Sequence, residues 1–374
     1  MKIGLNATCF NDRPSGAKQR FVGMYSELFK IMSDTEFIIF EPSDCILSDW
    51  FDRLPNLTFY KTPIPSEGRL IKSLKGVFFW NKILKKEKFD LFEGFNLPMV
   101  KNRYGKTVMT IHDLRGLKDE YSLLYQQIFK AVLNLSFYNA DHIITGSKEI
   151  EKDIADMFPE SSLSVIYNGI DKSRFFQKTD KDILKIKNRL NLPHKFILAV
   201  GHFEKRKNYE RLIKTISILE NDLPEYSLVI IGNNNGELNV VEELISSLSL
   251  SEKVKIYSGL TDLEVFCAYR SCSLFIFPSL YEGFGIPILE AMSAKIPIAL
   301  SDLEVFKEIT ESHLTYFNPL DIQSIQASIK SLLLDETARR QNIAYGQERI
   351  QAFTFKQLAT QMEAIYRDQC RKNA

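Results

Sequence analysis

Short apolar runs of strand length recur along this chain and alternate with stretches of helical periodicity. Seven occur in the first half, at residues 3–7, 37–40, 57–60, 90–94, 107–110, 142–145 and 165–167. Six more follow in the second half, at residues 196–201, 228–232, 254–257, 274–277, 296–300 and 315–317. Strands that are apolar on both faces and separated by helices are typical of parallel sheets covered by helices. The pattern therefore predicts an α/β protein built from two such units in tandem.

The boundary between the two units is placed where the pattern pauses. Residues 171–191 are charged and helix-permissive, so we expect the linker there, between an N-terminal domain at 1–172 and a second domain at 190–352. At 374 residues the chain is long enough for both. The last segment, 353–374, is expected to form a helix that packs on another element, because one of its faces is apolar. That face carries Leu358, Met362, Ile365 and Tyr366.

Composition argues against several classes of protein. A formal net charge of +1 gives no general basic surface for nucleic acid. The five cysteines contain no Cys-x-x-Cys pair and the five histidines form no ligand pair, so neither a disulfide framework nor a zinc site is expected. The N-terminus lacks the apolar core of a signal peptide, and no run approaches the ~20 apolar residues that span a bilayer. We expect a cytoplasmic protein whose membrane contact, where it occurs, is peripheral and on the inner face of the cytoplasmic membrane.

The most informative local motif is Tyr-Glu-Gly-Phe-Gly-Ile-Pro-Ile-Leu-Glu at residues 281–290. It joins a strand-like run to a helix-like run, so its glycine-rich turn lies at a helix N-terminus, where free amides attract a phosphate. Glu290, which we place in the first helical turn, can accept hydrogen bonds from a diol such as a nucleotide ribose, and Glu282 can face a second polyol. Alternatively, Glu290 only complements the helix dipole, and Gly283 and Gly285 are ordinary turn residues.

A basic turn follows the first strand of the second half. Residues 205–207 are Lys-Arg-Lys, between that strand and a helix-like stretch at 209–219. Because the carboxyl ends of parallel strands meet at one edge of a sheet, these cations should converge with residues 282–290 and supply charge-assisted donors to a diphosphate. The alternative is a solvated basic loop.

Other polar residues in the sequence are weaker candidates. Gly16 lies in a turn after the first strand, and His112 ends a later strand, where we expect it to project into a cleft opposite the second domain. A histidine followed by an aspartate at a strand end also fits a structural hydrogen bond. Asp180 and Asp182 form an Asp-x-Asp sequence among lysines, which we interpret as a solvated linker face and not as a metal site.

Residues 69–88 place lysines beside phenylalanines on one helical face. That combination resembles a helix lying on an anionic membrane surface. A core helix with snorkelling lysines is the alternative. The residues expected to contact the membrane are Lys72, Lys75, Phe78, Phe79, Lys82 and Lys86.

Taken together, these residues resemble the retaining nucleotide-sugar glycosyltransferases of glycosyltransferase family 4, which have the GT-B architecture. The resemblance covers nearly the whole chain, and its most specific element is the Glu-x7-Glu motif from Glu282 to Glu290. It also rests on the Gly16 turn, residues 111–114, residues 166–171 and the Arg206-Lys207-Asn208 loop. It implies an α/β fold of two Rossmann-like domains with parallel sheets facing across a cleft. The first domain would bind the acceptor, the second the nucleotide sugar, and the C-terminal helix would cross back to the first.

The resemblance also implies roles for individual residues. Arg206 and Lys207 would grip the donor diphosphate, Glu290 the ribose and Glu282 the sugar, and His112 would contact the transferred sugar. The full set implied to bind the donor is Gly16, Arg206, Lys207, Glu282, Gly283, Phe284, Gly285, Ile286 and Glu290. The set implied to be catalytic is His112, Arg206, Lys207 and Glu282. Two departures stand out: His202 replaces an arginine found in many members, and the Gly16 turn lacks a second glycine.

We therefore expect a retaining hexosyltransferase that acts in bacterial surface polysaccharide assembly. It would use a nucleoside-diphosphate sugar and a glycan or lipid-linked acceptor, without a metal or other cofactor and without nucleic acid. The strand end at residues 112–114 resembles that of bacterial mannosyl- and rhamnosyltransferases of surface polysaccharide assembly, which favours GDP-mannose, while UDP-hexoses stay open. The alternatives are a non-catalytic nucleotide-sugar-binding subunit and a UDP-sugar-using transferase with a soluble acceptor.

Overall fold

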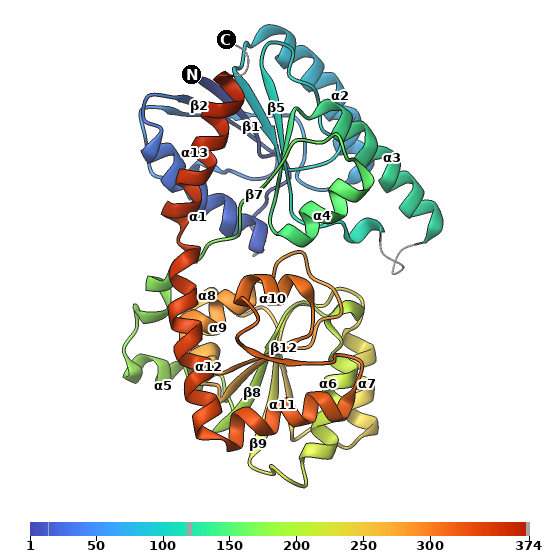
Figure 1. The fold of residues 1–374 in the computed structure, drawn as a ribbon, viewed down its shortest axis with the longest axis vertical. Coiled ribbons are helices and arrows are strands. Elements are labelled where there is room, and N and C mark those ends of the chain that lie inside the picture. Colours follow the sequence, from blue (N-terminus) through green and yellow to red (C-terminus); the bar gives the residue numbers. More distant parts are fainter. Residues whose placement is uncertain (14, 118–121, 372–374) are drawn as a thin grey trace. The chain divides into compact units, whose positions relative to one another are not determined.

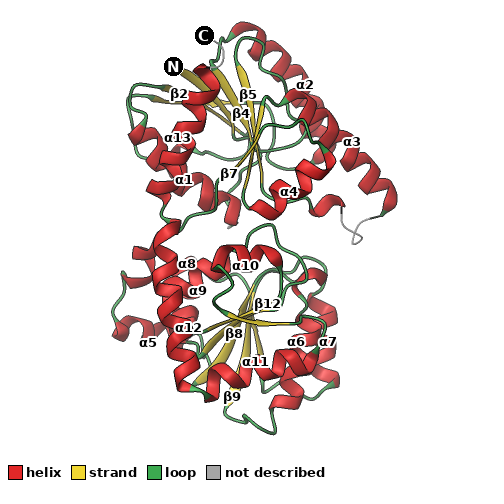
Figure 2. Cartoon of the chain, in the orientation of Figure 1, coloured by secondary structure: helices red, strands yellow, loops and turns green. Residues whose placement is uncertain are grey.

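The computed structural model describes residues 1–13, 15–117 and 122–371 and divides into two compact units (Figure 1). Unit 1 comprises Met1–Ile170 together with Thr354–Ala374, and unit 2 comprises Asp171–Phe353. In each unit, parallel strands lie between layers of helices (Figure 2). The α/β class and the two Rossmann-like units are thereby confirmed.

Unit 1 has a parallel sheet in the order β3-β2-β1-β4-β5-β6-β7. Its strands are β1 (Lys2–Asn6), β2 (Glu36–Glu41), β3 (Leu57–Lys61), β4 (Leu91–Gly94), β5 (Lys106–Ile111), β6 (His142–Thr145) and β7 (Leu163–Val165). Its helices are α1 (Gly16–Ile31), α2 (Arg69–Lys86), α3 (Leu123–Asn139), α4 (Lys148–Met157) and α13 (Phe355–Arg371). Short 3-10 turns lie at η1 (Ser48–Trp50) and η2 (Arg115–Leu117).

The helices of unit 1 cover both faces of this sheet because its strands are apolar on both sides. Helices α1 and α13 share one apolar cluster with the sheet, in which Met24, Leu28 and Met362 are buried. Helices α2, α3 and α4 share the cluster on the opposite face, represented by Trp80 and Leu133. The two helical layers are visible on either side of the strands in Figure 1.

The C-terminal helix α13 packs on α1, as its apolar face predicts. Leu358, Met362 and Tyr366 are buried there. Gly23 of α1 allows the close approach, because a Cβ atom at this position would lie 2.2 Å from the ring of Phe355. The terminal segment therefore belongs to unit 1, although it follows unit 2 in the sequence.

Unit 2 also has a parallel sheet, in the order β10-β9-β8-β11-β12-β13. Its strands are β8 (Lys195–Val200), β9 (Tyr226–Ile231), β10 (Val254–Tyr257), β11 (Leu274–Phe277), β12 (Ile298–Ser301) and β13 (Thr315–Phe317). Its helices are α5 (Asp180–Arg189), α6 (Tyr209–Leu219), α7 (Leu238–Ser247), α8 (Asp262–Ser271), α9 (Ile286–Ala294), α10 (Glu304–Thr310), α11 (Ile322–Leu334) and α12 (Glu336–Arg349). Its 3-10 turns are η3 (Lys172–Phe176), η4 (Lys205–Lys207) and η5 (Ile350–Phe353).

The segment expected to be a linker, residues 171–191, is instead a packed part of unit 2. Helix α5 lies against α8 and buries Ile183, while the ring centroid of Phe175 lies 4.3 Å from that of Phe266. These two apolar residues anchor the segment despite its many charges. The guanidinium of Arg270 also donates to the carboxylate of Asp180 at 2.5 Å.

Candidate active site

Two loops of unit 2 leave the sheet from neighbouring strands. Strands β8 and β11 pair directly, and the strand order reverses between them. In open α/β sheets, such a switch point is where ligands bind. The loop after β8 passes through η4, the loop after β11 leads into α9, and Leu280 N donates to the carbonyl oxygen of Arg206 at 2.7 Å. The two motifs singled out in the sequence are therefore in direct contact.

The centre of this contact is a charged cluster of Arg206, Lys207, Glu282 and Glu204. One carboxylate oxygen of Glu282 lies 2.6 Å from Lys207 Nζ and 2.8 Å from Arg206 Nη1. Arg206 Nε lies 2.6 Å from the carboxylate of Glu204. The side chains of Lys207 and Glu282 are 7% and 11% exposed, so these charges are largely removed from water and compensate one another.

The pKa values in the cluster reflect this pairing. Burial raises the pKa of Glu282, but Lys207 and Arg206 outweigh it, and the net shift is downward. Burial lowers the pKa of Arg206, but Glu282 and Glu204 reverse the shift and raise it. For Lys207, burial outweighs the attraction of Glu282 and lowers the pKa. The arrangement keeps Glu282 ionised and Arg206 cationic.

The geometry of η4 separates its three basic residues. Lys205 is exposed, whereas Lys207 is 6% exposed and its Nζ lies 4.7 Å from the ring centroid of Phe277. Asn208, in the left-handed region at φ 58°, holds the turn by donating from Nδ2 to the carbonyl oxygens of Pro278 and Pro319 at 3.0 and 2.8 Å. The run of three cations did not by itself distinguish them, whereas the family resemblance named Arg206 and Lys207, and these two reach the cluster.

Helix α9 begins at the glycine turn predicted from the sequence. Gly285 is its N-cap and adopts φ 113°, which only glycine tolerates readily. Phe284 is buried, with its ring centroid 6.2 Å from that of Phe353. The helix starts at Ile286, so Glu290 is its fifth residue and lies just beyond the first turn in which it was expected. Glu282 and the start of α9 therefore border the same turn.

Glu290 is 7% exposed, and its Oε2 accepts a hydrogen bond from the Tyr269 hydroxyl at 2.8 Å. That hydroxyl comes from α8, so a second helix fixes the orientation of the carboxylate. The pKa of Tyr269 is raised by burial and by the Glu290 charge, which keeps the phenol a donor. The sequence predicted Glu290 but gave no sign of its partner. His202, at the turn after β8, is exposed, and its Nδ1 accepts from Asn233 N at 3.3 Å.

In unit 1, His112 and Gly16 lie where two different strands lead out of the sheet. His112 directly follows β5 and is half-buried. Burial, with a smaller contribution from Arg20, lowers its pKa to about 3, so its imidazole is neutral at physiological pH. Gly16 is the first residue of α1, and the preceding Ser15 caps this helix by accepting from Lys18 N at 3.1 Å.

Two buried residues of unit 1 were missed in the sequence. Arg20 is 2% exposed and donates from Nη1 to the carbonyl oxygens of Ile166, at 2.7 Å, and Tyr167. Glu93 of β4 is fully buried and accepts from the hydroxyls of Tyr25, at 2.7 Å, and Tyr366. Glu93 is a charged residue within the apolar run 91–95, and that was the signal available, whereas Arg20 follows Lys18 and Gln19 and has no such signal.

Neither aspartate of the Asp-x-Asp sequence stands alone. Asp182 forms a capping box with Thr179 at the start of α5, and Asp180 binds Arg270. Among the residues that the structure describes, no group of three or more His, Cys, Asp or Glu side chains is arranged to hold a metal ion. Nor does the described part of the chain contain a helix with the length and apolarity to cross a bilayer.

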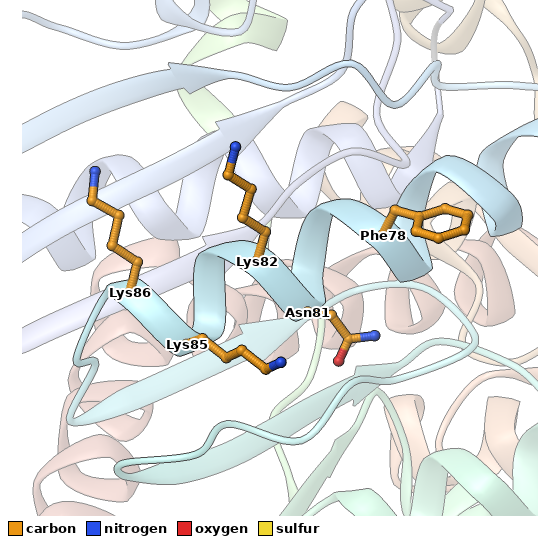
Figure 3. A pocket seen from close by; sticks show the side chains of 5 residues that line it. All are labelled: Phe78, Asn81, Lys82, Lys85 and Lys86. Carbon is orange, nitrogen blue, oxygen red and sulfur yellow. The ribbon is translucent and has the colours of Figure 1, made fainter.

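The outer surface of α2 carries four of the six residues expected to contact a membrane. Lys75, Phe78, Lys82 and Lys86 are exposed, and Phe78 and Lys82 line a shallow hollow with Asn81, Lys85 and Lys86 (Figure 3). The other two lie elsewhere. Phe79 packs inward against Phe40 and Trp80, because it falls on the same side of the helix as the buried residues. Lys72 is half-buried, and its Nζ donates to the carbonyl oxygen of Ser66 at 3.1 Å.

Comparison with known proteins identifies the family of the chain. Residues 45–174 match Glycosyltransferase Family 4, and residues 180–349 match Glycosyl transferases group 1. The chain is 29% identical to the O-antigen chain mannosyltransferase RfbU of Salmonella typhimurium over 63% of its length and 62% of that protein. It is 32% identical to the serotype-specific mannosyltransferase WbdA of Escherichia coli, over 64% of this chain but 31% of that protein. The matches thus span less than two thirds of either relative.

A structural relative extends the likeness to both units. The sucrose-phosphate synthase of Thermosynechococcus elongatus superposes with a TM-score of 0.78, covering 98% of each chain at 20% sequence identity. At that identity, the likeness concerns the fold alone. The two family matches, with this GT-B fold, show that the chain belongs to the glycosyltransferases of family 4.

Proposed function

We propose that this glycosyltransferase moves a hexosyl unit from a nucleoside-diphosphate sugar to a glycan or lipid-linked acceptor in bacterial surface polysaccharide assembly. The observation that carries the proposal is the cluster of Arg206, Lys207 and Glu282 at the switch point of unit 2. GDP-mannose is the first candidate donor, because the relatives RfbU and WbdA are named as mannosyltransferases.

The cluster suits a diphosphate leaving group. Lys207 has three N–H donors and Glu282 takes one of them, so the ammonium can bind an added anion while keeping its ion pair. As the bond between the anomeric carbon and the diphosphate oxygen breaks, negative charge develops on that oxygen. Preorganised cations near the N-terminus of α9 stabilise such charge without reorganising. Glu282 then positions Lys207 and Arg206 in addition to facing the donor sugar.

We assign the remaining steps to donor and acceptor atoms. With retention of configuration, the acceptor oxygen bonds to the anomeric carbon on the face that the diphosphate leaves, and a phosphate oxygen accepts the hydroxyl proton. Glu290 would bind the ribose, with Tyr269 fixing its carboxylate. His112 would contact the transferred sugar as a neutral hydrogen-bonding group, which its lowered pKa favours.

A panel of UDP, GDP, ADP and dTDP sugars tests the donor class. A ligand at 100 times its dissociation constant should stabilise the protein by about 2.7 kcal/mol, visible as a raised melting temperature. We expect one nucleotide class to do so and to be hydrolysed slowly. NMR of the glycosidic product should show the anomeric configuration of the donor. Binding without hydrolysis or transfer would favour a non-catalytic subunit.

We also propose that no metal ion takes part, since cations of the chain itself face the expected diphosphate. Turnover should be unchanged in excess EDTA. Complete loss of activity that magnesium or manganese restores would contradict this.

The acceptor would be met at an anionic membrane, at the inner face of the cytoplasmic membrane. The exposed residues Lys75, Phe78, Lys82 and Lys86 of α2 support this part of the proposal. Lysines near such a surface each contribute ~1 kcal/mol to binding.

A further inference from the structure

Helix α3 exposes a stripe of apolar side chains that was not recognised in the sequence. Leu124, Ile128, Leu135 and Tyr138 are 68%, 56%, 54% and 86% exposed. They are separated by four, seven and three residues, so they share one face of the helix, and the exposed Ala131 fills the middle. We call these five residues the α3 stripe. Single exposed apolar residues are ordinary, but a continuous stripe marks a surface that binds something.

The α3 stripe faces away from the sheet because the opposite side of the helix packs on the sheet. Leu133 and Phe137 of α3 are buried in the cluster that also buries Trp80 and Leu84 of α2. Helices α2 and α3 thus cover the same face of the unit 1 sheet (Figure 1). Their outer surfaces, the stripe on α3 and the lysines on α2, lie on the same side of this unit.

The charge of these two helices indicates the kind of partner. The chain has 48 basic and 47 acidic residues, yet α2 contains six basic residues and no acidic one. Helix α3 adds Lys130 and likewise has no acidic residue. The next helix on this face, α4, contains Glu149, Glu151, Asp153 and Asp156. Of the three helices in this layer, α2 and α3 therefore lack acidic residues, and α3 carries the apolar stripe.

We propose that α2 and α3 together dock on an anionic lipid bilayer, with the α3 stripe inserted among the acyl chains and the α2 lysines on the headgroups. Apolar residues flanked by lysines, with a tyrosine at one end, match the chemistry of the membrane interface. A second copy of the chain would bring the same lysines together, so charge complementarity favours the bilayer. The inference rests on the proposed function in that a lipid-linked acceptor would be reached from this surface, but it uses no residue of the donor site.

Vesicle co-sedimentation of the full chain tests the inference. The stripe variant replaces three residues by the helix-forming glutamine: Leu124→Gln, Ile128→Gln and Leu135→Gln. Its matched control changes three similarly exposed leucines of unit 2: Leu184→Gln, Leu320→Gln and Leu334→Gln. The lysine variant carries Lys75→Gln, Lys82→Gln, Lys85→Gln and Lys86→Gln. Its control carries Lys178→Gln, Lys181→Gln, Lys185→Gln and Lys356→Gln.

We expect the wild type to sediment with mixed phosphatidylglycerol and phosphatidylcholine vesicles and to be released by salt. The stripe variant should bind at least ~100-fold more weakly, because three apolar side chains no longer enter the bilayer. The lysine variant should bind at least ~10-fold more weakly. Both controls should bind like the wild type. Circular dichroism and nucleotide-sugar thermal shifts, measured on every variant, report the fold and the donor site separately.

Three results would overturn the inference. One is a wild type that ignores anionic vesicles at low salt. Another is a stripe variant that binds as tightly as its control, which would reduce docking to the charge of α2. The third is a concentration-dependent dimer in light scattering that the stripe variant abolishes, which would assign the stripe to a second copy of the chain. A wild type whose melting temperature no nucleotide sugar raises would instead contradict the proposed function.

Discussion

Unit 1 buries a glutamate on the strand next to its first strand, and unit 2 places one in the loop that follows the corresponding strand, but the two glutamates have opposite surroundings. In unit 1, β4 lies beside β1 and carries Glu93; in unit 2, β11 lies beside β8 and leads to Glu282. Glu282 faces two cations, and its pKa is lowered. Glu93 faces hydroxyl groups, and burial raises its pKa despite their hydrogen bonds and the Arg20 charge.

The difference indicates two uses of a carboxyl group, one within the central strand of unit 1 and one in the loop after the corresponding strand of unit 2. A charged cluster can exchange or share its partners with an incoming anion, which suits a binding site. A carboxyl group satisfied by the hydroxyls of Tyr25 and Tyr366 joins α1 and α13 to the sheet and has little to offer a ligand. The contrast supports the proposal that the donor binds in unit 2, and it makes Glu93, with Tyr25 and Tyr366, the anchor of the terminal helix in unit 1.

The largest effect is expected at Lys207. Its replacement by alanine should lower turnover about 100-fold or more, the scale of losing one charge-stabilising donor. Lys205→Ala is the matched control, because Lys205 lies in the same turn but is exposed. Steady-state kinetics on both folded proteins gives the comparison. Equal turnover in the two variants would remove Lys207 from the proposed mechanism.

The next effect concerns the anchor in unit 1. Tyr366→Phe removes one hydrogen bond to a buried carboxyl group and should lower the free energy of unfolding of unit 1 by about 2 kcal/mol. Tyr345→Phe is the control, since that hydroxyl bonds to an exposed Glu311 at 3.3 Å. Hydrogen exchange resolved by segment can assign the change to α13 and β4. If the free energy of unfolding falls equally in both variants, the hydrogen bond from Tyr366 to Glu93 does not anchor α13 more strongly than an exposed hydrogen bond would.

A smaller effect separates the two glutamates of the motif. Glu290→Gln should weaken binding of the free nucleoside diphosphate about tenfold, because a ribose hydroxyl loses a charged acceptor. Glu282→Gln should chiefly weaken binding of the intact nucleotide-sugar donor. Titration calorimetry with both ligands distinguishes the roles, and the reverse pattern would show that they are exchanged.

The smallest effect is a difference in pH dependence. The raised pKa of Glu93 stabilises the folded state at low pH, and this contribution is lost as pH rises above the ordinary glutamate value. The lowered pKa of Glu282 stabilises the folded state above the ordinary value, and this contribution is lost as pH falls below it. As the pH rises from 4 to 7, the free energy of unfolding of Glu93→Gln should therefore increase relative to that of the wild type. That of Glu282→Gln should decrease relative to the wild type over the same range. Denaturant unfolding at several pH values measures both trends; slopes of the same sign would contradict the assigned environments.

The sequence predicted the strands because they are apolar on both faces, which is a local property. Runs such as 37–40 and 274–277 need no knowledge of their neighbours to be recognised, and both are strands in the structure. Residues 171–191 misled the interpretation because only Phe175 and Ile183 reveal their packing among many charges.

The candidate site was predicted in its parts but not in its contacts. Lys207 and Glu282 are 75 residues apart, and their ion pair depends on the pairing of β8 with β11. The separation of Lys205 from Lys207 depends on how the η4 turn directs successive side chains, which spacing alone does not give. On α2, the inward position of Phe79 depends in the same way on which side of the helix meets the sheet.

The most direct test of the donor site is hydrogen exchange of the wild-type chain with and without the donor identified by the nucleotide panel. We expect the strongest protection at residues 201–209 and 279–290, the two loops joined by the Lys207–Glu282 ion pair. Lys207→Ala should lose that protection, while Lys205→Ala should keep it. Protection that falls mainly outside these two loops, or that survives in Lys207→Ala, would contradict a diphosphate site at this cluster.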